Sequence, residues 1–236
     1  MPASLQPVPG TPASTGRRGF AATAARPVTV MLGTTSKSAE LCTVNQMKGL
    51  VLLAHVGPVG QGDSANRHLA ALLHRCNLGT LSFDLLTEDE FADERCGRDI
   101  ALQAWRLSQA VLWADGCRPL PGGPYGLTAS GTGAAAALEV AVAMPGSVAA
   151  IVSGSGRPDL AWRHLPRVRA PTLLLVGDRE PTVTEHNRAA LRVLKCVKRL
   201  EVIPGADDLA AETGTYEGAA ALAAQWLQAH LHHRRV

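Results

Sequence analysis

The chain has 236 residues, of which 46% are hydrophobic and 18% charged, a balance typical of a globular protein with a sizeable core. The formal net charge is only +3, with scattered Lys and Arg and few aromatic residues, which argues against nucleic-acid binding. No apolar run reaches the ~18 residues of a membrane span, and five dispersed cysteines without a CxxC pair predict a cytoplasmic protein without disulfides or a metal site.

Residues 1–27 are rich in Pro, Ala, Ser, Thr and Gly and contain no acidic residue. This composition predicts a disordered tail. A transit peptide is the alternative, because arginines without acidic residues also fit such a segment. We expect one folded domain over residues 28–236.

Strand and helix patterns alternate after this tail. The first expected strand covers residues 28–32, and an apolar run at 49–56 is typical of a strand buried on both faces. The later elements, in chain order, are a helix at 64–77, a strand at 79–85, a helix at 98–116, a strand at 124–130, a helix at 132–144, strands at 148–154 and 171–177, a helix at 185–196, a strand at 198–205 and a helix at 216–231. This alternation predicts the α/β class, with a mostly parallel sheet and helices on both faces.

The stretch "ASGTG" at residues 129–133 joins an expected strand to an alanine-rich helix. In open α/β sheets, ligands bind beyond the carboxyl ends of the strands. A nucleophile elbow at such an end needs small residues two positions before and after its centre, and Ala129 and Gly133 meet that need. The centre, Gly131, has no side chain to attack with. Glycine also avoids the ~1–3 kcal/mol that positive φ costs other residues, so the turn can persist without a nucleophile.

The same glycines also match the dinucleotide-binding pattern G-x-G-x-x-A, which follows a strand and opens a helix. Backbone N–H groups at a helix start favour a pyrophosphate. The pattern normally belongs to the first strand of the nucleotide half and needs an acid at the end of the next strand. Here several strand–helix units come first, and no acid follows "IVSGSG" until Asp159.

Several segments together resemble a known family. The order "GLVLLAH", "FDLL", "YGLTASGTGAAAAL", "RVRAPTLLLVGDRE" and "KRLEVIPGADDL" is similar to the dienelactone-hydrolase-like branch of the α/β-hydrolase superfamily, over residues 45–232. The resemblance implies an α/β-hydrolase fold of three layers. It also implies a catalytic nucleophile at the elbow, an acid after "PTLLLVG" and a histidine after "RLEVIPG".

Carried over residue by residue, the resemblance implies a degenerate triad. Gly131 matches the nucleophile position, Glu180 the acid position, with Asp178 as a nearby substitute, and Asp208 the histidine position. An aspartate is already ionised near neutral pH, so it is a far weaker base than imidazole and has no proton for the leaving group. We therefore expect ordinary serine hydrolysis to be lost.

The family's "HG" after the first buried strand matches His55 followed by Val56 and Gly57 here. The N–H of Gly57 is a candidate for an oxyanion hole, whereas Pro58 has none to offer. His55 itself is interpreted as structural.

Three residues are candidate replacements for the missing groups. Ser130 is expected to point away from the turn because strand side chains alternate in direction. Thr132, in the first helical turn, is expected to bond the backbone. His186 follows the acid loop and is the best substitute base that the sequence offers.

The leading hypothesis is a catalytically degenerate α/β-hydrolase-fold protein that binds a small molecule or a partner in the old cleft, without a cofactor. Contacts to that ligand are expected from His55, Gly57, Ser130, Thr132, Asp178 and His186. One alternative is an active enzyme with altered or non-hydrolytic chemistry, such as a lyase or cyclase, that uses the remaining acids or His186. The other is a dinucleotide-binding protein. The edge strands of such a sheet also allow a homodimer.

Overall fold

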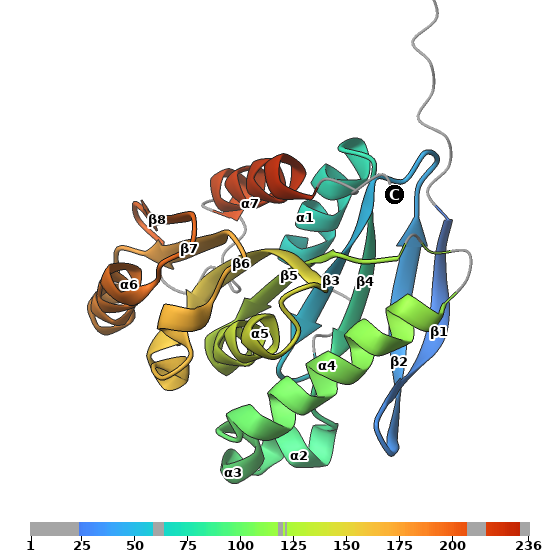
Figure 1. Cartoon of the computed structure of the whole chain (residues 1–236), viewed down its shortest axis with the longest axis horizontal. Coiled ribbons are helices and arrows are strands. Elements are labelled where there is room, and N and C mark those ends of the chain that lie inside the picture. The colour runs from blue at the N-terminus through green and yellow to red at the C-terminus, as the bar shows by residue number, and fades with distance from the viewer. Residues whose placement is uncertain (1–23, 59–63, 118–119, 121, 207–215, 232–236) are drawn as a thin grey trace, which may run out of the picture.

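The computed structural model describes residues 24–58, 64–117, 120, 122–206 and 216–231, which form an eight-stranded sheet between helices (Figure 1). The strands lie in the order β1-β2-β4-β3-β5-β6-β7-β8. β2 is antiparallel to both of its neighbours, whereas every pair from β4 to β8 is parallel. This arrangement confirms the predicted α/β class and its mostly parallel sheet.

The strands are β1 (Ala24–Leu32), β2 (Thr35–Thr43), β3 (Gly49–His55), β4 (Leu78–Asp84), β5 (Tyr125–Ser130), β6 (Val148–Gly156), β7 (Thr172–Gly177) and β8 (Lys198–Ile203). The helices are α1 (Ser64–Arg75), α2 (Glu88–Ala92), α3 (Glu94–Gly97), α4 (Ile100–Gly116), α5 (Gly131–Ala143), α6 (Pro181–Val193) and α7 (Tyr216–His230), with 3-10 turns η1 (Pro158–Ala161) and η2 (Leu165–Arg167).

The two faces of the sheet carry separate hydrophobic cores. Helices α4, α5 and α6 cover one face, and α1 and α7 cover the other (Figure 1). The central strand β3 contributes to both, because Leu52 lies in the first core and Leu53 in the second. Helix α5 is buried along most of its length, as its almost wholly apolar sequence predicts. The site at the start of α5 therefore rests on a closely packed support.

The amino-terminal part of the domain differs from the prediction. β1 begins at Ala24 instead of residue 28, and it forms a hairpin with β2, a strand that the sequence reading missed. Exposed polar residues such as Ser38 and Glu40 alternate with inward residues such as Leu41 in β2, and this weakens its apolar signal. Residues 24–27, predicted as part of the tail, therefore belong to β1. Residues 1–23 lie outside the described part of the chain.

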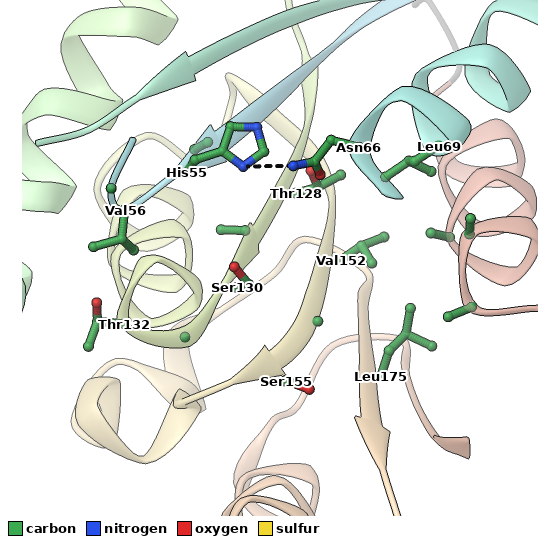
Figure 2. Close-up of a pocket in the computed structure, with 18 of the residues that line it drawn as sticks. His55, Val56, Asn66, Leu69, Thr128, Ser130, Thr132, Val152, Ser155 and Leu175 are labelled. Carbon is green, nitrogen blue, oxygen red and sulfur yellow. Dashed lines mark hydrogen bonds between the residues drawn. The ribbon is translucent and has the colours of Figure 1, made fainter. Parts of the chain in front are cut away.

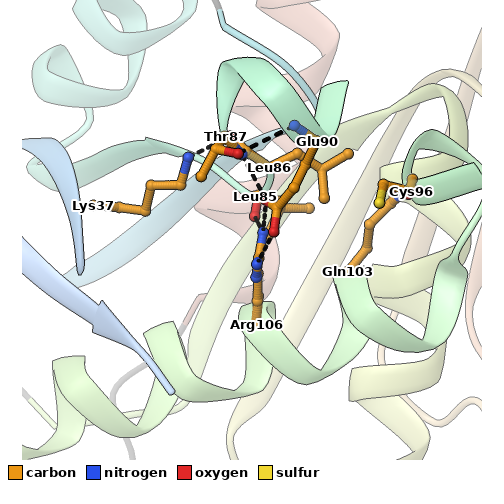
Figure 3. Close-up of polar contacts among 8 residues, drawn as sticks. All are labelled: Lys37, Leu85, Leu86, Thr87, Glu90, Cys96, Gln103 and Arg106. Carbon is orange, nitrogen blue, oxygen red and sulfur yellow. Dashed lines mark hydrogen bonds and ion pairs between the residues drawn. The ribbon is translucent and has the colours of Figure 1, made fainter. Parts of the chain in front are cut away.

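Residues 86–97, expected to be irregular, contain the short helices α2 and α3. A capping box fixes α2, since Thr87 Oγ1 accepts from the N–H of Glu90 and Glu90 Oε2 accepts from the N–H of Thr87. The same Glu90 receives Arg106 of α4, with Nη2 2.6 Å from Oε1, while Arg106 Nη1 donates to the carbonyl of Leu85 at 2.7 Å (Figure 3). We call residues 85–97 the cap segment.

The ion pair between Arg106 and Glu90 joins the cap segment to the body of the domain. The Arg106 side chain is 4% exposed and that of Glu90 27%, so the pair is largely shielded from solvent. Lys37 of β2 adds a bond from its ammonium to the Leu86 carbonyl (Figure 3). The fold of the cap segment therefore depends on basic side chains from two elements outside it, α4 and β2.

Replacing Glu90 with Gln is expected to lower the free energy of unfolding by about 3 kcal/mol, because the buried guanidinium loses its counter-charge. Urea unfolding at pH 7 measures this loss. Glu94→Gln is the matched control: Glu94 pairs with Arg98, but their side chains are 83% and 78% exposed, so the expected change is below about 1 kcal/mol. Equal losses in the two variants would contradict the prediction.

The same pair predicts a pH dependence. Its hydrogen bond from Arg106 is the largest cause that lowers the pKa of Glu90 from 4.5 to about 2. A carboxyl whose pKa is lowered by folding stabilises the protein above the unfolded value and loses that contribution as the pH falls through the folded value. The stability gap between the wild type and Glu90→Gln should therefore hold above pH 4.5 and shrink toward pH 2. Urea titrations at a series of pH values measure it, and a gap independent of pH would refute this account.

Candidate functional site

A cavity of about 500 Å³ opens at the carboxyl ends of β3, β5, β6 and β7. This is the edge of the sheet at which the sequence reading expected a ligand. Figure 2 shows its polar lining from His55, Asn66, Ser130 and Ser155, and its apolar lining from residues such as Leu175. The cavity is thus built from strand ends and helix starts, which are held by the two cores.

Gly131 forms the turn between β5 and α5. Its φ is +52°, which is the left-handed conformation predicted for the centre of the elbow. The Gly131 carbonyl accepts a hydrogen bond from the N–H of Arg157 at 2.9 Å, and Gly131 pairs with Gly156, so β6 fixes the turn. A Cβ added at Gly131 would meet nothing within 4 Å, and Gly131 lines the cavity. The turn therefore has an elbow-like backbone with open space where a side chain would project.

The two neighbours of Gly131 have different surroundings. Ser130 lines the cavity, so the prediction that it points away from the turn is wrong (Figure 2). Ser130 occupies the N-cap position of α5 and has an extended backbone, so the alternation of side-chain direction along β5 ends here. Its hydroxyl makes no capping bond. Thr132 Oγ1 donates to the carbonyl of Gly97 at 3.1 Å, which is a backbone bond as expected, although to the cap segment. Thr132 thus ties the cap segment to the elbow.

His55 lies at the end of β3 with partners for both ring nitrogens. Its Nε2 is 3.2 Å from Ser82 Oγ, and its Nδ1 is 3.3 Å from Asn66 Nδ2 (Figure 2). Asn66, a cavity residue that the sequence reading did not single out, comes from the first turn of α1. Both contacts orient the imidazole, as the structural interpretation of His55 predicts.

Gly57 lies under the ring of Phe91, because a Cβ added at Gly57 would be 2.2 Å from Phe91 Cδ2. Both residues line the cavity, and Phe91 belongs to α2 of the cap segment. A side chain at position 57 would therefore displace the ring of Phe91. Phe91 was not predicted as a site residue, since an aromatic residue in an irregular segment gives no signal of its neighbours.

Glu180 follows β7 and lines the cavity at the N-cap position of α6. Ser155 Oγ donates to Glu180 Oε2 at 2.7 Å. Ser155 is 8% exposed and has φ of +42°, a conformation that costs a residue with a side chain on the order of 1–3 kcal/mol. Ser155 therefore combines a strained backbone with a carboxylate partner.

Asp178 and His186 do not line the cavity. Asp178 Oδ1 accepts a hydrogen bond from the N–H of Gly205 at 2.8 Å, which holds the loop after β8. His186 Nδ1 lies 3.6 Å from Asp159 Oδ1, facing η1. Helix α6 begins at Pro181, earlier than predicted, and thereby directs His186 to this neighbour. Asp208 lies outside the described residues, so its expected place beside Glu180 stays a prediction.

Within residues 24–58, 64–117, 120, 122–206 and 216–231, no group of three His, Cys, Asp or Glu side chains is arranged to hold a metal ion. None of the described helices is long and apolar enough to cross a membrane.

The sheet and the elbow-like turn define an α/β-hydrolase fold, and comparison with known proteins gives the family. The dienelactone hydrolase of Anabaena variabilis superposes with a TM-score of 0.82 and 36% identity, over 88% of this chain and 98% of that one. The chain belongs to the dienelactone hydrolase family. A dienelactone hydrolase-like promiscuous phosphotriesterase from metagenomic libraries, 18% identical, shares the fold with a TM-score of 0.72 over 89% of this chain and 99% of that one. No family model matches the chain.

Two curated relatives, from two strains of Mycobacterium tuberculosis, carry the name phosphoribosyl transferase. Each is 38% identical over 204 residues, which are 86% of this chain and 46% of theirs. The chain therefore spans about half the length of these relatives.

Gly131→Ala is expected to lower the free energy of unfolding by about 1 kcal/mol through its positive φ alone, because the new methyl group enters open space. Gly156→Ala should cost more, since its Cβ would lie 2.0 Å from Ser153 Oγ and 2.5 Å from Ala134 Cβ. Urea unfolding of both variants ranks the two costs. The reverse order would show that Gly131 is not at an open tip.

Proposed function

We propose that this member of the dienelactone hydrolase family binds a small organic molecule in the cavity and lacks ordinary Ser-His-Asp hydrolysis. The open position at Gly131 carries the proposal, because the turn has the backbone of an elbow and no atom for the attack. In well-studied enzymes, loss of a nucleophile lowers turnover by on the order of a million-fold. Asp208 at the family's histidine position, by sequence, supports the same conclusion.

The cavity itself supports ligand binding. A volume of about 500 Å³ falls within the range of small-molecule sites, and its lining is mainly apolar with a few polar groups. The N–H groups at the start of α5 and the hydroxyl of Ser130 offer hydrogen bonds to a ligand.

The name of the Mycobacterium tuberculosis relatives is a weaker guide. The matched segment is less than half of those chains, so their named activity belongs to the whole proteins. Among the described lining residues of this cavity there is no Lys or Arg, the usual side chains that bind phosphate. We therefore do not propose phosphoribosyl transfer for this cavity.

A second candidate is catalysis of a non-hydrolytic kind. The contact between Ser155 and Glu180 favours it, because a carboxylate held beside a hydroxyl in a cavity can exchange a proton with a bound substrate. This candidate requires a substrate that reacts without a covalent acyl-enzyme. Chemical conversion of a ligand that binds in the cavity, lost in Glu180→Gln, would favour it over binding alone.

The proposed function predicts that a fluorophosphonate probe does not label the wild-type chain and that p-nitrophenyl acetate is not turned over. Gly131→Ser combined with Asp208→His is the positive control, since it supplies a hydroxyl and an imidazole at the two family positions and should gain labelling. Intact-protein mass spectrometry and peptide mapping measure both. Labelling of one serine or threonine in the wild type would end the proposal that hydrolysis is lost.

A further inference from the structure

The charged part of the described cavity lining is acidic. Glu180 is the only acidic side chain among its described lining residues, and no Lys or Arg accompanies it. No ion pair to Glu180 is found among the described residues. Among the described residues, the Glu180 carboxylate thus faces the cavity without a basic side chain beside it.

Glu180 stands at the acid position of a family whose triad places an imidazole beside that acid. In a working triad the imidazole becomes positively charged during the reaction, and the acid stabilises that charge. Here the acid is kept, while the matching histidine position holds Asp208 by sequence. The cavity therefore retains half of a charge pair, and a ligand can supply the other half.

Ser155 holds the Glu180 carboxylate in place. Its hydroxyl donates at 2.7 Å, and it does so from a backbone with φ of +42°. Glycine would adopt this φ at no steric cost, so the serine keeps a strained backbone for the sake of its hydroxyl. One hydroxyl donor leaves further lone pairs of the carboxylate to accept from a ligand.

The remaining walls suit an apolar body. Val152 lies on β6, as does Ser155, Leu175 lies on β7, which precedes Glu180, and Leu69 lies on α1 (Figure 2). Ala223 of α7 completes this apolar wall. A flat or branched hydrocarbon group can bury apolar surface against them while a polar end reaches Glu180.

We propose that the cavity selects an organic amine whose ammonium group pairs with Glu180 and whose apolar body lies against these walls. The inference rests on the proposed function, that the cavity binds a small molecule, and adds the chemical class of that molecule. Ser155 is a positioning residue in this arrangement, since it acts through the carboxylate. An anionic ligand at the start of α5 is the opposing outcome, because a helix N-terminus favours negative charge.

Three probes of similar shape distinguish these outcomes: benzylamine, a cation at pH 7, benzyl alcohol, which is neutral, and benzoate, an anion. Titration of the full chain by NMR measures the Kd of each. The expected order is benzylamine first, by about tenfold over benzyl alcohol, with benzoate weakest, because a partly desolvated ion pair adds attraction that an alcohol lacks. Equal affinity for amine and alcohol, or a preference for benzoate, would overturn the inference.

Variants test which residues create the preference. Glu180→Gln should bring benzylamine to within about twofold of benzyl alcohol, since the amide keeps the size and loses the charge. Ser155→Gly should weaken benzylamine several-fold without loss of stability, because glycine suits the φ of +42°. Glu185→Gln, on the exposed side of α6, is the matched control and should leave the preference intact. A preference that persists in Glu180→Gln would contradict the assignment.

Gly131→Phe locates the binding, since its ring would enter the open space at the elbow, and Gly131→Ala controls for its backbone strain. Benzylamine should bind the alanine variant and lose affinity for the phenylalanine variant. If no probe binds the wild type, or all bind Gly131→Phe unchanged, the proposed function fails and the amine inference fails with it. If probes bind in the cavity without preference for the cation, only the amine inference fails.

Discussion

The left-handed turn at Gly131 couples the sheet of this protein to its site. The turn ends β5 and starts α5 without an intervening loop, so β5 sets the position of the helix start at the cavity. β6 reinforces the turn through the bond from Arg157 to the Gly131 carbonyl. Because α5 is buried along most of its length, any shift of the turn would disturb the core beneath it. Packing of α5 and the bonds from the end of β6 are therefore sufficient to hold this geometry, whatever side chain position 131 carries.

The cap segment forms part of the wall of the cavity. It reaches the elbow through the bond from Thr132 to Gly97 and reaches the loop after β3 through Phe91 over Gly57. Its own short helices bury no residue, so apolar burial alone does not fix them. Arg106, supplied by the long helix α4, compensates for this by binding Glu90 and the Leu85 carbonyl together. The shape of the cavity consequently depends on the ion pair between Arg106 and Glu90, which do not line it.

The sequence allowed the fold to be predicted because its central strands and helices have unambiguous patterns. The run around Leu52 is apolar without interruption, and the glycines around position 131 mark the turn, so both were placed correctly. The hairpin of β1 and β2 was missed because Ser, Lys and Thr residues of β2 interrupt its apolar pattern. The site was predicted only in part. A pattern of small residues identifies an elbow, but it does not say that Ser130 lines the cavity or that Phe91 covers Gly57. Such contacts join residues far apart in the chain, and one sequence carries no record of them.

The hydroxyl of Ser155 gives the strongest reason to regard the cavity as a site still in use. A cleft that only fills space has no need of a residue at φ of +42°, since glycine would give the same turn without strain. Strain of this kind persists where the surrounding structure holds it, and here it brings a hydroxyl to 2.7 Å from Glu180. The dinucleotide interpretation of the same region gives no role to this contact, because it relies on the glycines at the start of α5 alone. An acid oriented by a neighbour and facing an apolar cavity is instead the arrangement that a binding site for a complementary charge requires. The proposed ligand thus gives a role to two features at once, the acid at Glu180 and the strained serine beside it.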